Sequence, residues 1–318
     1  MQNTAKPATA FAGDVLSGLT SDPKHLPSKY FYDEKGDKIF QQIMAMPEYY
    51  LTNCEFDNFI KNKAEILAFA TETDFDLIEL GAGDGTKTKI LLQYLTEQAA
   101  DFRYLPIDIS AHALRELAAD LEENMPAVKV ETQQGDYFEV LENLKNIGTR
   151  PKLVLFLGSN IGNFSKTQAV DFLQKMHAAL SPGDLLLIGA DLKKDPAVIR
   201  LAYNDPAGIT AAFNLNLLER MNRELGANFL IKNWKHWETY NPATGETKSY
   251  LVSKCDQTVH ISALHRSFDF AAWEAVWVEL SQKYSLSELE NLAESAGFRT
   301  KKHFLSDGNY FTDSLFVR

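Results

Sequence analysis

Cysteine and metal-type spacings are scarce in this sequence. Its 318 residues include two cysteines, Cys54 and Cys255, which lie far apart, so neither a disulfide framework nor a zinc site is indicated. The seven histidines form no H-x-x-H or H-E-x-x-H pair, and we therefore expect no metal. A low cysteine content is typical of a reducing compartment, so the expected location is the cytoplasm.

Positive charge and long apolar runs are also in short supply. The chain has 32 Lys and Arg residues against 43 Asp and Glu residues, a formal net charge of −11. Nucleic-acid binding needs clustered basic side chains, so we expect no DNA or RNA partner. The longest apolar runs are strand-length, and residues 1–20 lack the pattern of a signal peptide, so we expect no membrane partner. The protein is expected to be soluble, and we expect a monomer.

The middle of the chain has the pattern of a parallel β-sheet with crossover helices, because short apolar runs alternate with longer amphipathic stretches. Helices are expected at 111–123 and 166–180, and a C-terminal helix at 286–297. Strands are expected at 76–80, 102–107, 128–132, 153–157, 184–189, 298–305 and 310–317. The fold class is therefore α/β.

The flanking segments differ in composition and predict a second domain. Residues 20–60 and 196–235 are typical of helices, whereas 234–240 and 248–262 predict two strands around the turn at 241–245. We interpret these flanks as an inserted α+β cap that binds the substrate. The expected domains are a core formed by 55–190 plus 284–318 and a substrate-binding domain formed by 10–54 plus 191–283.

Three glycines, Gly81, Gly83 and Gly85, lie between the first expected strand and the following helix. Glycine is needed where the backbone passes close to a ligand that a side chain would exclude. The same pattern occurs in tight strand-to-helix turns that bind nothing, so the motif is weak on its own.

Two acids at strand ends strengthen the prediction of a nucleoside site. Asp108 ends the second expected strand, and Asp136 follows the third and precedes Tyr137. Ligands of open α/β sheets bind outside the carboxyl ends of the strands, where Asp108 can accept hydrogen bonds from both ribose hydroxyls. Asp136 can accept a hydrogen bond from the amine of an adenine. The alternative for Asp108 is a helix cap, a role that Ser110 can also fill.

The spacing of the glycines distinguishes two ligands. A dinucleotide favours G-x-G-x-x-G, but here the third glycine comes one residue early, and Asp84 adds negative charge where a phosphate would bind. S-adenosylmethionine carries no phosphate and has a cationic sulfonium. We therefore favour a class I (Rossmann-like) methyltransferase core. A dinucleotide-dependent oxidoreductase is the alternative, and a binding module without turnover is a third possibility.

A polar, glycine-rich segment, 158–164, follows the fourth expected strand. It lies at the edge of the sheet where a methyl acceptor would bind, and the amide of Asn163 can donate to a carboxylate. The alternative is an Asx turn that caps the helix from 166.

Several segments resemble the histidine Nα-methyltransferases of ergothioneine biosynthesis. The resemblance extends over about residues 16–318. Its motifs are 26–40 continuing to 46–52, 80–89, 156–163, 202–214 and 279–284.

This resemblance implies a set of site residues and a reaction, in which S-adenosylmethionine donates methyl groups to L-histidine and to its mono- and dimethyl forms, ending at hercynine. The expected donor-binding residues are Tyr32, Gly81, Lys87, Asp108, Asp136 and Tyr137, to which we add Phe40 and Gly83. The expected histidine-binding residues are Tyr49, Asn163, Tyr203, Glu279 and Ser281.

The residue types agree with these roles. Asn163 and Tyr203 can donate hydrogen bonds to the α-carboxylate. Glu279 and Ser281 are two apart, and therefore on one face if extended, where they can hold an imidazole. We expect Glu279 to set the specificity for histidine; the alternative is a solvated acid near the start of a helix.

The reaction needs a free amine, so a proton must leave before transfer. We expect the hydroxyls of Tyr32 and Tyr49, with water, to relay it, and therefore name both as catalytic. The nearest rival is an enzyme of the same fold that methylates another small amine, such as a tryptophan derivative. Glu279 argues against it, because an indole needs only one acceptor and no ion pair. One departure from some relatives is Ser249, where they carry a bulkier apolar residue.

Overall fold

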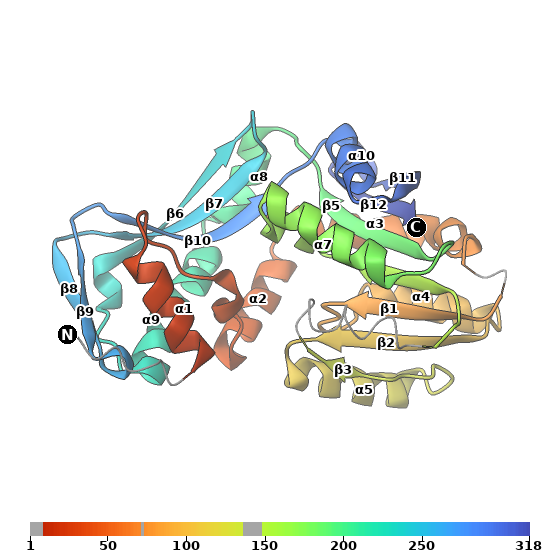
Figure 1. The fold of residues 1–318 in the computed structure, drawn as a ribbon, viewed down its shortest axis with the longest axis horizontal. Coiled ribbons are helices and arrows are strands. Elements are labelled where there is room, and N and C mark those ends of the chain that lie inside the picture. Colours follow the sequence, from red (N-terminus) through yellow and green to blue (C-terminus); the bar gives the residue numbers. More distant parts are fainter. Residues whose placement is uncertain (1–8, 71–72, 136–147) are drawn as a thin grey trace. The chain divides into compact units, whose positions relative to one another are not determined.

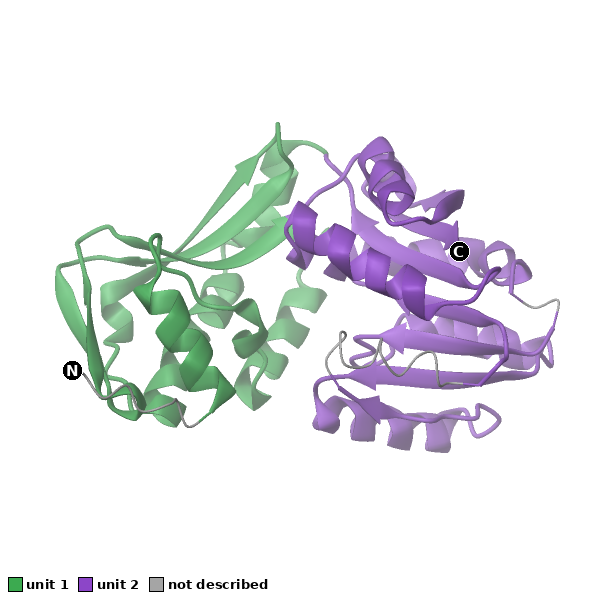
Figure 2. Ribbon diagram, in the orientation of Figure 1, with its two compact units in different colours: residues 1–50, 194–281 green, residues 51–193, 282–318 purple. Residues whose placement is uncertain are grey.

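The computed structural model describes residues 9–70, 73–135 and 148–318 and divides into two compact units (Figure 1, Figure 2). Unit 1 comprises Met1–Tyr50 and Lys194–Ser281, and unit 2 comprises Leu51–Lys193 and Gln282–Arg318. The chain therefore passes from one unit to the other three times, after Tyr50, Lys193 and Ser281. The sequence predicted these domain boundaries at 54/55, 190/191 and 283/284.

Unit 2 contains a seven-stranded sheet in the order β11-β12-β5-β4-β1-β2-β3. Its strands are β1 (Phe75–Leu80), β2 (Phe102–Asp108), β3 (Gln133–Gln134), β4 (Lys152–Phe156), β5 (Leu185–Asp191), β11 (Arg299–Leu305) and β12 (Phe311–Val317). β1 pairs in parallel with both β2 and β4, and β5 pairs in parallel with β4. β12 is antiparallel to both of its neighbours, β5 and β11. The expected Rossmann-like α/β class is confirmed.

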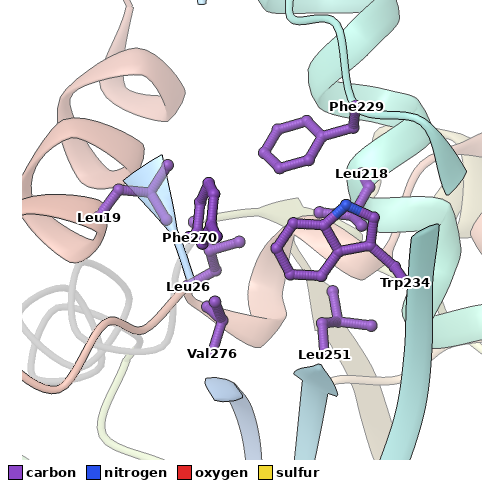
Figure 3. A pocket seen from close by; sticks show the side chains of 8 residues that line it. All are labelled: Leu19, Leu26, Leu218, Phe229, Trp234, Leu251, Phe270 and Val276. Carbon is purple, nitrogen blue, oxygen red and sulfur yellow. The ribbon is translucent and has the colours of Figure 1, made fainter. Parts of the chain in front are cut away.

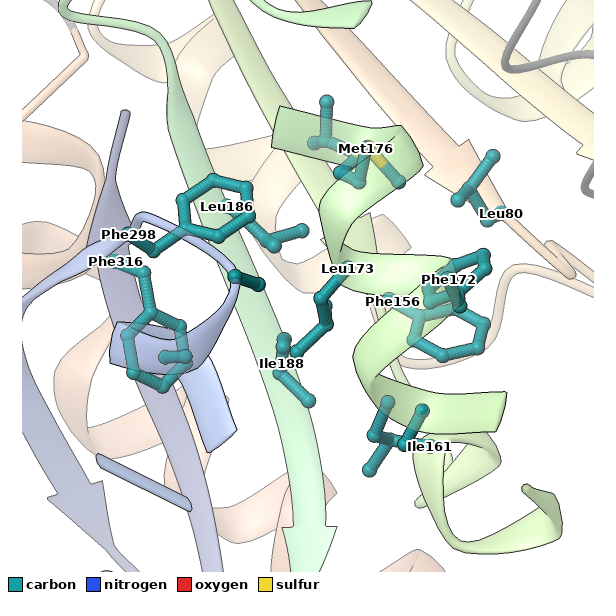
Figure 4. Close-up of a cluster of buried hydrophobic side chains, with 14 of the residues drawn as sticks. Leu80, Phe156, Ile161, Phe172, Leu173, Met176, Leu186, Ile188, Phe298 and Phe316 are labelled. Atoms are coloured by element: carbon teal, nitrogen blue, oxygen red, sulfur yellow. The ribbon is translucent and has the colours of Figure 1, made fainter. Parts of the chain in front are cut away.

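Alternating side chains of the buried strands supply two cores, one on each face of this sheet. Val154 and Phe156 of β4 belong to one core, with residues of α7 (Lys166–Ala179) and α10 (Leu286–Ser295). Figure 4 shows part of this core, including Phe156 with Phe172, Leu173 and Met176 of α7. Leu153 and Leu155 belong to the other, with α3 (Tyr50–Ala68), α4 (Thr88–Glu97) and α5 (Ala111–Asn124). Strands buried on both faces are expected to be apolar throughout, which is why the sequence shows runs there.

Unit 1 is built from helices and two small antiparallel sheets. The helices are α1 (Ala10–Thr20), α2 (Glu34–Ala45), α8 (Pro196–Tyr203) and α9 (Ile209–Leu225). One sheet has the order β10-β7-β6, with β6 (Trp234–Asn241), β7 (Glu246–Ser253) and β10 (Ala275–Gln282). The other pairs β8 (Gln257–Ile261) with β9 (Arg266–Phe270).

The core of unit 1 is apolar and lies where the helices meet these sheets. Phe213 and Met221 of α9 pack in it with Leu251 of β7 and Val276 of β10. Figure 3 shows a small gap inside this core, between Trp234, Phe270 and other apolar side chains. Because the side chains around it are aliphatic or aromatic and none is charged, the gap is a packing feature and not a candidate site.

Two expected strands need correction, and two further strands were not expected. Residues 128–132 form no regular strand: Val130 makes only an isolated bridge to Tyr104, and the ladder with β2 is β3, two residues long. The expected strand 248–262 is two strands in different sheets, because the chain breaks pairing after Ser253 and β8 then pairs with β9. β9 and β10 were not expected as strands.

Candidate active site

The glycine turn follows β1, at the point where the sheet order reverses between β1 and β4. Such switch points are where open α/β sheets bind ligands. The amide of Gly81 donates to the carbonyl of Ile107 at 2.8 Å, which ties the turn to the end of β2. Gly81, Gly83 and Gly85 all have positive φ, at 74°, 55° and 65°. Each therefore adopts a left-handed backbone conformation that other residues disfavour.

The glycines of this turn have different reasons to lack a side chain. A Cβ on Gly85 would lie 2.6 Å from Cδ1 of Leu117, so this glycine allows α5 to pack. A Cβ on Gly83 would meet no atom within 4 Å. The space beside Gly83 is thus open, which is the feature that a ligand-binding turn requires.

Asp108 holds the turn from the end of β2. Its Oδ2 accepts a hydrogen bond from the amide of Gly83 at 3.0 Å, and its Oδ1 accepts one from the amide of Ser110 at 2.8 Å. Ser110, and not Asp108, is the N-cap of α5, because its hydroxyl accepts from the amide of Ala113. Each carboxylate oxygen can accept two hydrogen bonds, so the half-buried Asp108 keeps capacity for the hydroxyls of a ribose.

Glu79 is a buried acid in β1 that sequence reasoning did not single out. Its carboxylate accepts hydrogen bonds from the hydroxyls of Thr88, at 2.6 Å, and Tyr104. Burial outweighs these bonds and raises the pKa of Glu79 to about 7. The carboxyl of Glu79, two residues before Gly81, therefore changes its charge near neutral pH.

We expect Glu79→Gln to remove a pH dependence of stability. The native state holds the Glu79 proton from pH 4.5 to about 7, where the unfolded chain has lost it, so the free energy of unfolding falls as pH rises through this window. At 1.36 kcal/mol per pKa unit, the wild type should lose about 2.5 kcal/mol relative to Glu79→Gln between pH 5 and pH 8. Urea titrations at both pH values test this, and equal changes in the two proteins would contradict it.

Lys87, expected in the donor site, lies at the N-terminus of α4 in unit 2. Its ammonium forms an ion pair with Glu55 of α3, whose side chain is completely buried. Sequence reasoning missed Glu55. A signal was present, since Glu55 and Asn58 follow Leu51 by four and seven residues and thus place polar groups on the apolar face of the helix.

The remaining site residues of unit 2 are Asp136, Tyr137 and Asn163. Asp136 and Tyr137 lie outside the described residues. Asn163 is exposed at the end of a 3₁₀ turn (Asn160–Asn163), and its amide lies 3.5 Å from Oδ1 of Asn160. Ser165 caps α7 through a capping box, so the alternative role of Asn163 as that cap is wrong.

Glu279 and Ser281 lie in β10 and not near the start of a helix, so the solvated helical acid is excluded. With Trp277 they occupy one face of the strand, whereas Val276 and Val278 belong to the apolar core. Oε2 of Glu279 accepts a hydrogen bond from the hydroxyl of Ser249 at 3.1 Å. The carboxylate is half-buried and held by a neighbouring strand.

Tyr203 completes this group from the end of α8. Its hydroxyl lies 2.9 Å from Oγ of Ser281, and both residues are buried. On the next helical turn back, Arg200 donates from Nε to the buried Glu238 of β6 at 3.0 Å. Nε2 of His236 is 3.0 Å from the carbonyl of Tyr203, and because burial lowers the pKa of His236 the neutral ring donates this bond. These contacts fix Tyr203 on the sheet.

An aromatic cluster extends from Tyr203 to the three expected residues nearest the N-terminus. The ring centroids of Tyr49 and Tyr203 are 6.2 Å apart, those of Phe40 and Tyr49 are 6.5 Å apart, and those of Tyr32 and Phe40 are 5.5 Å apart. Phe213 of α9 packs against both Tyr32 and Phe40. Unit 1 therefore brings together Tyr32, Phe40, Tyr49 and Tyr203, although they come from separate segments.

Within residues 9–70, 73–135 and 148–318, no group of three or more His, Cys, Asp or Glu side chains could hold a metal ion. No helix in these ranges is both long and apolar enough to span a bilayer.

Comparison with known proteins identifies relatives over nearly the whole chain. A family model described as "Histidine-specific methyltransferase, SAM-dependent" matches residues 11–318. The histidine N-alpha-methyltransferase of Mycolicibacterium smegmatis is 37% identical over 311 residues, which cover 98% of this chain and 96% of that protein. Ergothioneine biosynthesis protein 1 of Neurospora crassa is 33% identical over 294 residues, covering 91% of this chain and 32% of that protein. The L-tryptophan methyltransferase of Psilocybe serbica is 30% identical over 312 residues, which cover 89% of this chain and 86% of that protein.

Proposed function

The chain belongs to the histidine-specific, S-adenosylmethionine-dependent methyltransferases, and from this premise we propose which nitrogen it methylates, how often, and with which residues. The enzyme transfers methyl groups to the α-amino nitrogen of L-histidine, in three successive reactions that end at the trimethyl betaine hercynine. This is the first step of ergothioneine biosynthesis. We further propose that it acts as a monomer in the cytoplasm.

The residues of unit 2 fit the methyl donor. The open space beside Gly83 can admit an adenosyl group, and Asp108 at the strand end offers its carboxylate to the ribose hydroxyls. Asp84 is exposed and accepts a hydrogen bond from the amide of Thr86, so this end of the turn is anionic and unsuited to a phosphate. S-adenosylmethionine supplies an electrophilic methyl group on a cationic sulfonium.

The single observation that carries histidine as the acceptor is the arrangement on one face of β10. Glu279 can accept a hydrogen bond from a ring N–H, and the nearby Ser281 hydroxyl can serve the other ring nitrogen. Ser249 donates to Oε2 of Glu279 and orients the carboxylate. The serine therefore supports histidine binding at a position where some relatives carry an apolar residue. An indole has one ring N–H and no second ring nitrogen, which favours histidine over a tryptophan derivative.

Positioning then accounts for the choice of nitrogen. With the imidazole held by Glu279 and the α-carboxylate held by Tyr203 of the same unit, the α-nitrogen is the group left to react, and Asn163 stays a predicted ligand of the carboxylate. One proton must leave the nitrogen before each of the three transfers, and the hydroxyls of Tyr32 and Tyr49 pass it to water without a dedicated strong base. The aromatic cluster also favours the increasingly methylated, cationic amine, by about 0.5–2 kcal/mol for each ring that it meets face-on.

Mass spectrometry of the purified enzyme with L-histidine and S-adenosylmethionine tests the proposal. We expect mono-, di- and trimethylhistidine to appear in that order, with fragment ions that place every methyl group on the α-nitrogen. Calorimetric titration in the presence of S-adenosylhomocysteine should show binding of L-histidine but not of L-tryptophan, and NAD should not bind. Ring-methylated histidine, or methylated tryptophan in place of histidine, would overturn the assignment.

A further inference from the structure

We propose that Glu55 is a positioning residue of the methyl-donor site, which holds both Lys87 and the backbone of Gly158 in place. This inference rests on the proposed role of Lys87 in donor binding. Glu55 lies in α3, its side chain is completely buried, and it touches none of the reacting atoms in the mechanism above.

Glu55 connects two segments that follow neighbouring parallel strands. Its carboxylate forms the ion pair with Lys87, at the start of the helix that follows β1. The amide of Gly158, just after β4, donates to the same carboxylate, at 2.9 Å from Oε1 and 3.0 Å from Oε2. Because β1 and β4 flank the point where the strand order reverses, one side chain fixes both sides of the place where open sheets bind ligands.

The sheet is shaped to admit this carboxylate. A Cβ on Gly189 of β5 would lie 2.0 Å from Oε1 of Glu55, a distance that no side chain can tolerate. The backbone of Gly158 has φ of 69°, and a Cβ there would lie 3.5 Å from Nζ of Lys87. Glycine at 189 thus leaves the room that Glu55 occupies.

A second buried acid, Asp313 of β12, lies close to this cluster. Its Oδ2 accepts a hydrogen bond from the side-chain amide of Asn58 at 2.6 Å. Burial, and then the charge of Glu55, raise the pKa of Asp313 well above its usual range.

Glu55 also acts on the charge of Lys87. Burial alone would lower the pKa of Lys87, but the attraction of Glu55 raises it, which favours the charged ammonium. Held by Glu55, the ammonium brings directed N–H groups to the methyl-donor site. The function of Glu55 is thus to aim these donors.

A comparable buried ion pair lies at the opposite end of the strands, the amino end, in the same sheet. Asp76, at the amino end of β1, is also completely buried and accepts two hydrogen bonds from Arg103, at 2.9 and 2.8 Å. The partner cations are similarly exposed, 26% for Arg103 and 21% for Lys87. Asp76→Asn therefore disrupts a comparable buried pair away from the strand ends where ligands bind.

The test is a double-mutant cycle read by calorimetric binding of S-adenosylhomocysteine. Glu55→Gln and Lys87→Met should each weaken binding by about tenfold or more, and the double variant should be no weaker than Lys87→Met alone, because Glu55 acts mainly through Lys87. In steady-state kinetics, Glu55→Gln should raise KM for S-adenosylmethionine and leave KM for histidine unchanged. Asp76→Asn should lower the melting temperature without changing the affinity for S-adenosylhomocysteine.

The outcomes separate this inference from the proposed function. Wild-type affinity in Glu55→Gln, or losses that multiply in the double variant, would overturn the role of Glu55. If Glu55→Gln does not fold, Glu55→Asp replaces it, since it keeps the charge but shortens the reach, and the same comparison with Lys87→Met applies. The binding measurements contain no histidine, so they remain decisive even if histidine proves not to be the substrate.

Discussion

Replacing Glu279 with alanine is expected to lower kcat/KM for L-histidine by about a hundredfold or more, because hydrogen bonds to a charged group contribute about 1.5–3 kcal/mol each and the buried Ser249 hydroxyl would also lose its acceptor. The effect should fall on histidine alone. Glu279 lies in β10 of unit 1, whereas the glycine turn and Asp108 belong to unit 2. Steady-state kinetics with each substrate varied in turn measures the change.

Two variants define what Glu279 contributes. Glu279→Gln keeps an oxygen acceptor for the ring N–H but loses the charge, so its kcat/KM should lie between those of the wild type and Glu279→Ala. Ser249→Ala removes the hydroxyl that orients Oε2 and should cost about tenfold at most. Normal turnover of histidine by Glu279→Ala would remove this residue from the site and, with it, the reason to prefer histidine over another small amine.

Asp108→Asn should weaken binding of S-adenosylhomocysteine by about a hundredfold, through the loss of two kinds of bond. Both oxygens of Asp108 accept hydrogen bonds from backbone amides, those of Gly83 and Ser110. An asparagine presents one oxygen and one NH₂ group, so in either orientation an N–H donor would meet another donor. The glycine turn would shift, and an acceptor for the ribose would be lost as well.

Asp84→Asn is the matched control for this measurement. Asp84 lies in the same turn and loses the same charge, but it is exposed and accepts a single hydrogen bond, from the amide of Thr86, which the asparagine oxygen can still accept. We expect calorimetry to show donor affinity within about threefold of the wild type for this variant. Equal losses in both variants would mean that general negative charge, and not the geometry of Asp108, supports binding.

Much of unit 2 could be predicted because its pattern is local. Each apolar run, the glycine turn and the acid at the end of β2 can be recognised from neighbouring residues alone. The topology of a parallel sheet then brings the strand ends together. The distinction between Gly83 and Gly85 could not be predicted, since it depends on Leu117, which α5 brings next to Gly85.

The parts that escaped prediction depend on pairing between distant residues. Glu55 is 32 residues from Lys87 and more than 100 from Gly158, so no spacing rule connects them. β10 was missed although Val276, Val278 and Leu280 alternate with Trp277, Glu279 and Ser281, which is the period-two pattern of a half-buried strand. Only the resemblance to known methyltransferases directed attention to Glu279.

The position of β12 constrains how the protein can be made. This strand, residues 311–317, lies between β5 and β11 in the sheet. The sheet that carries the glycine turn therefore cannot be completed until residue 317 has left the ribosome. Until then β5 presents an unpaired edge to other nascent chains. Translation that stops before residue 311 would therefore release a polypeptide prone to aggregate, and not a partly active enzyme.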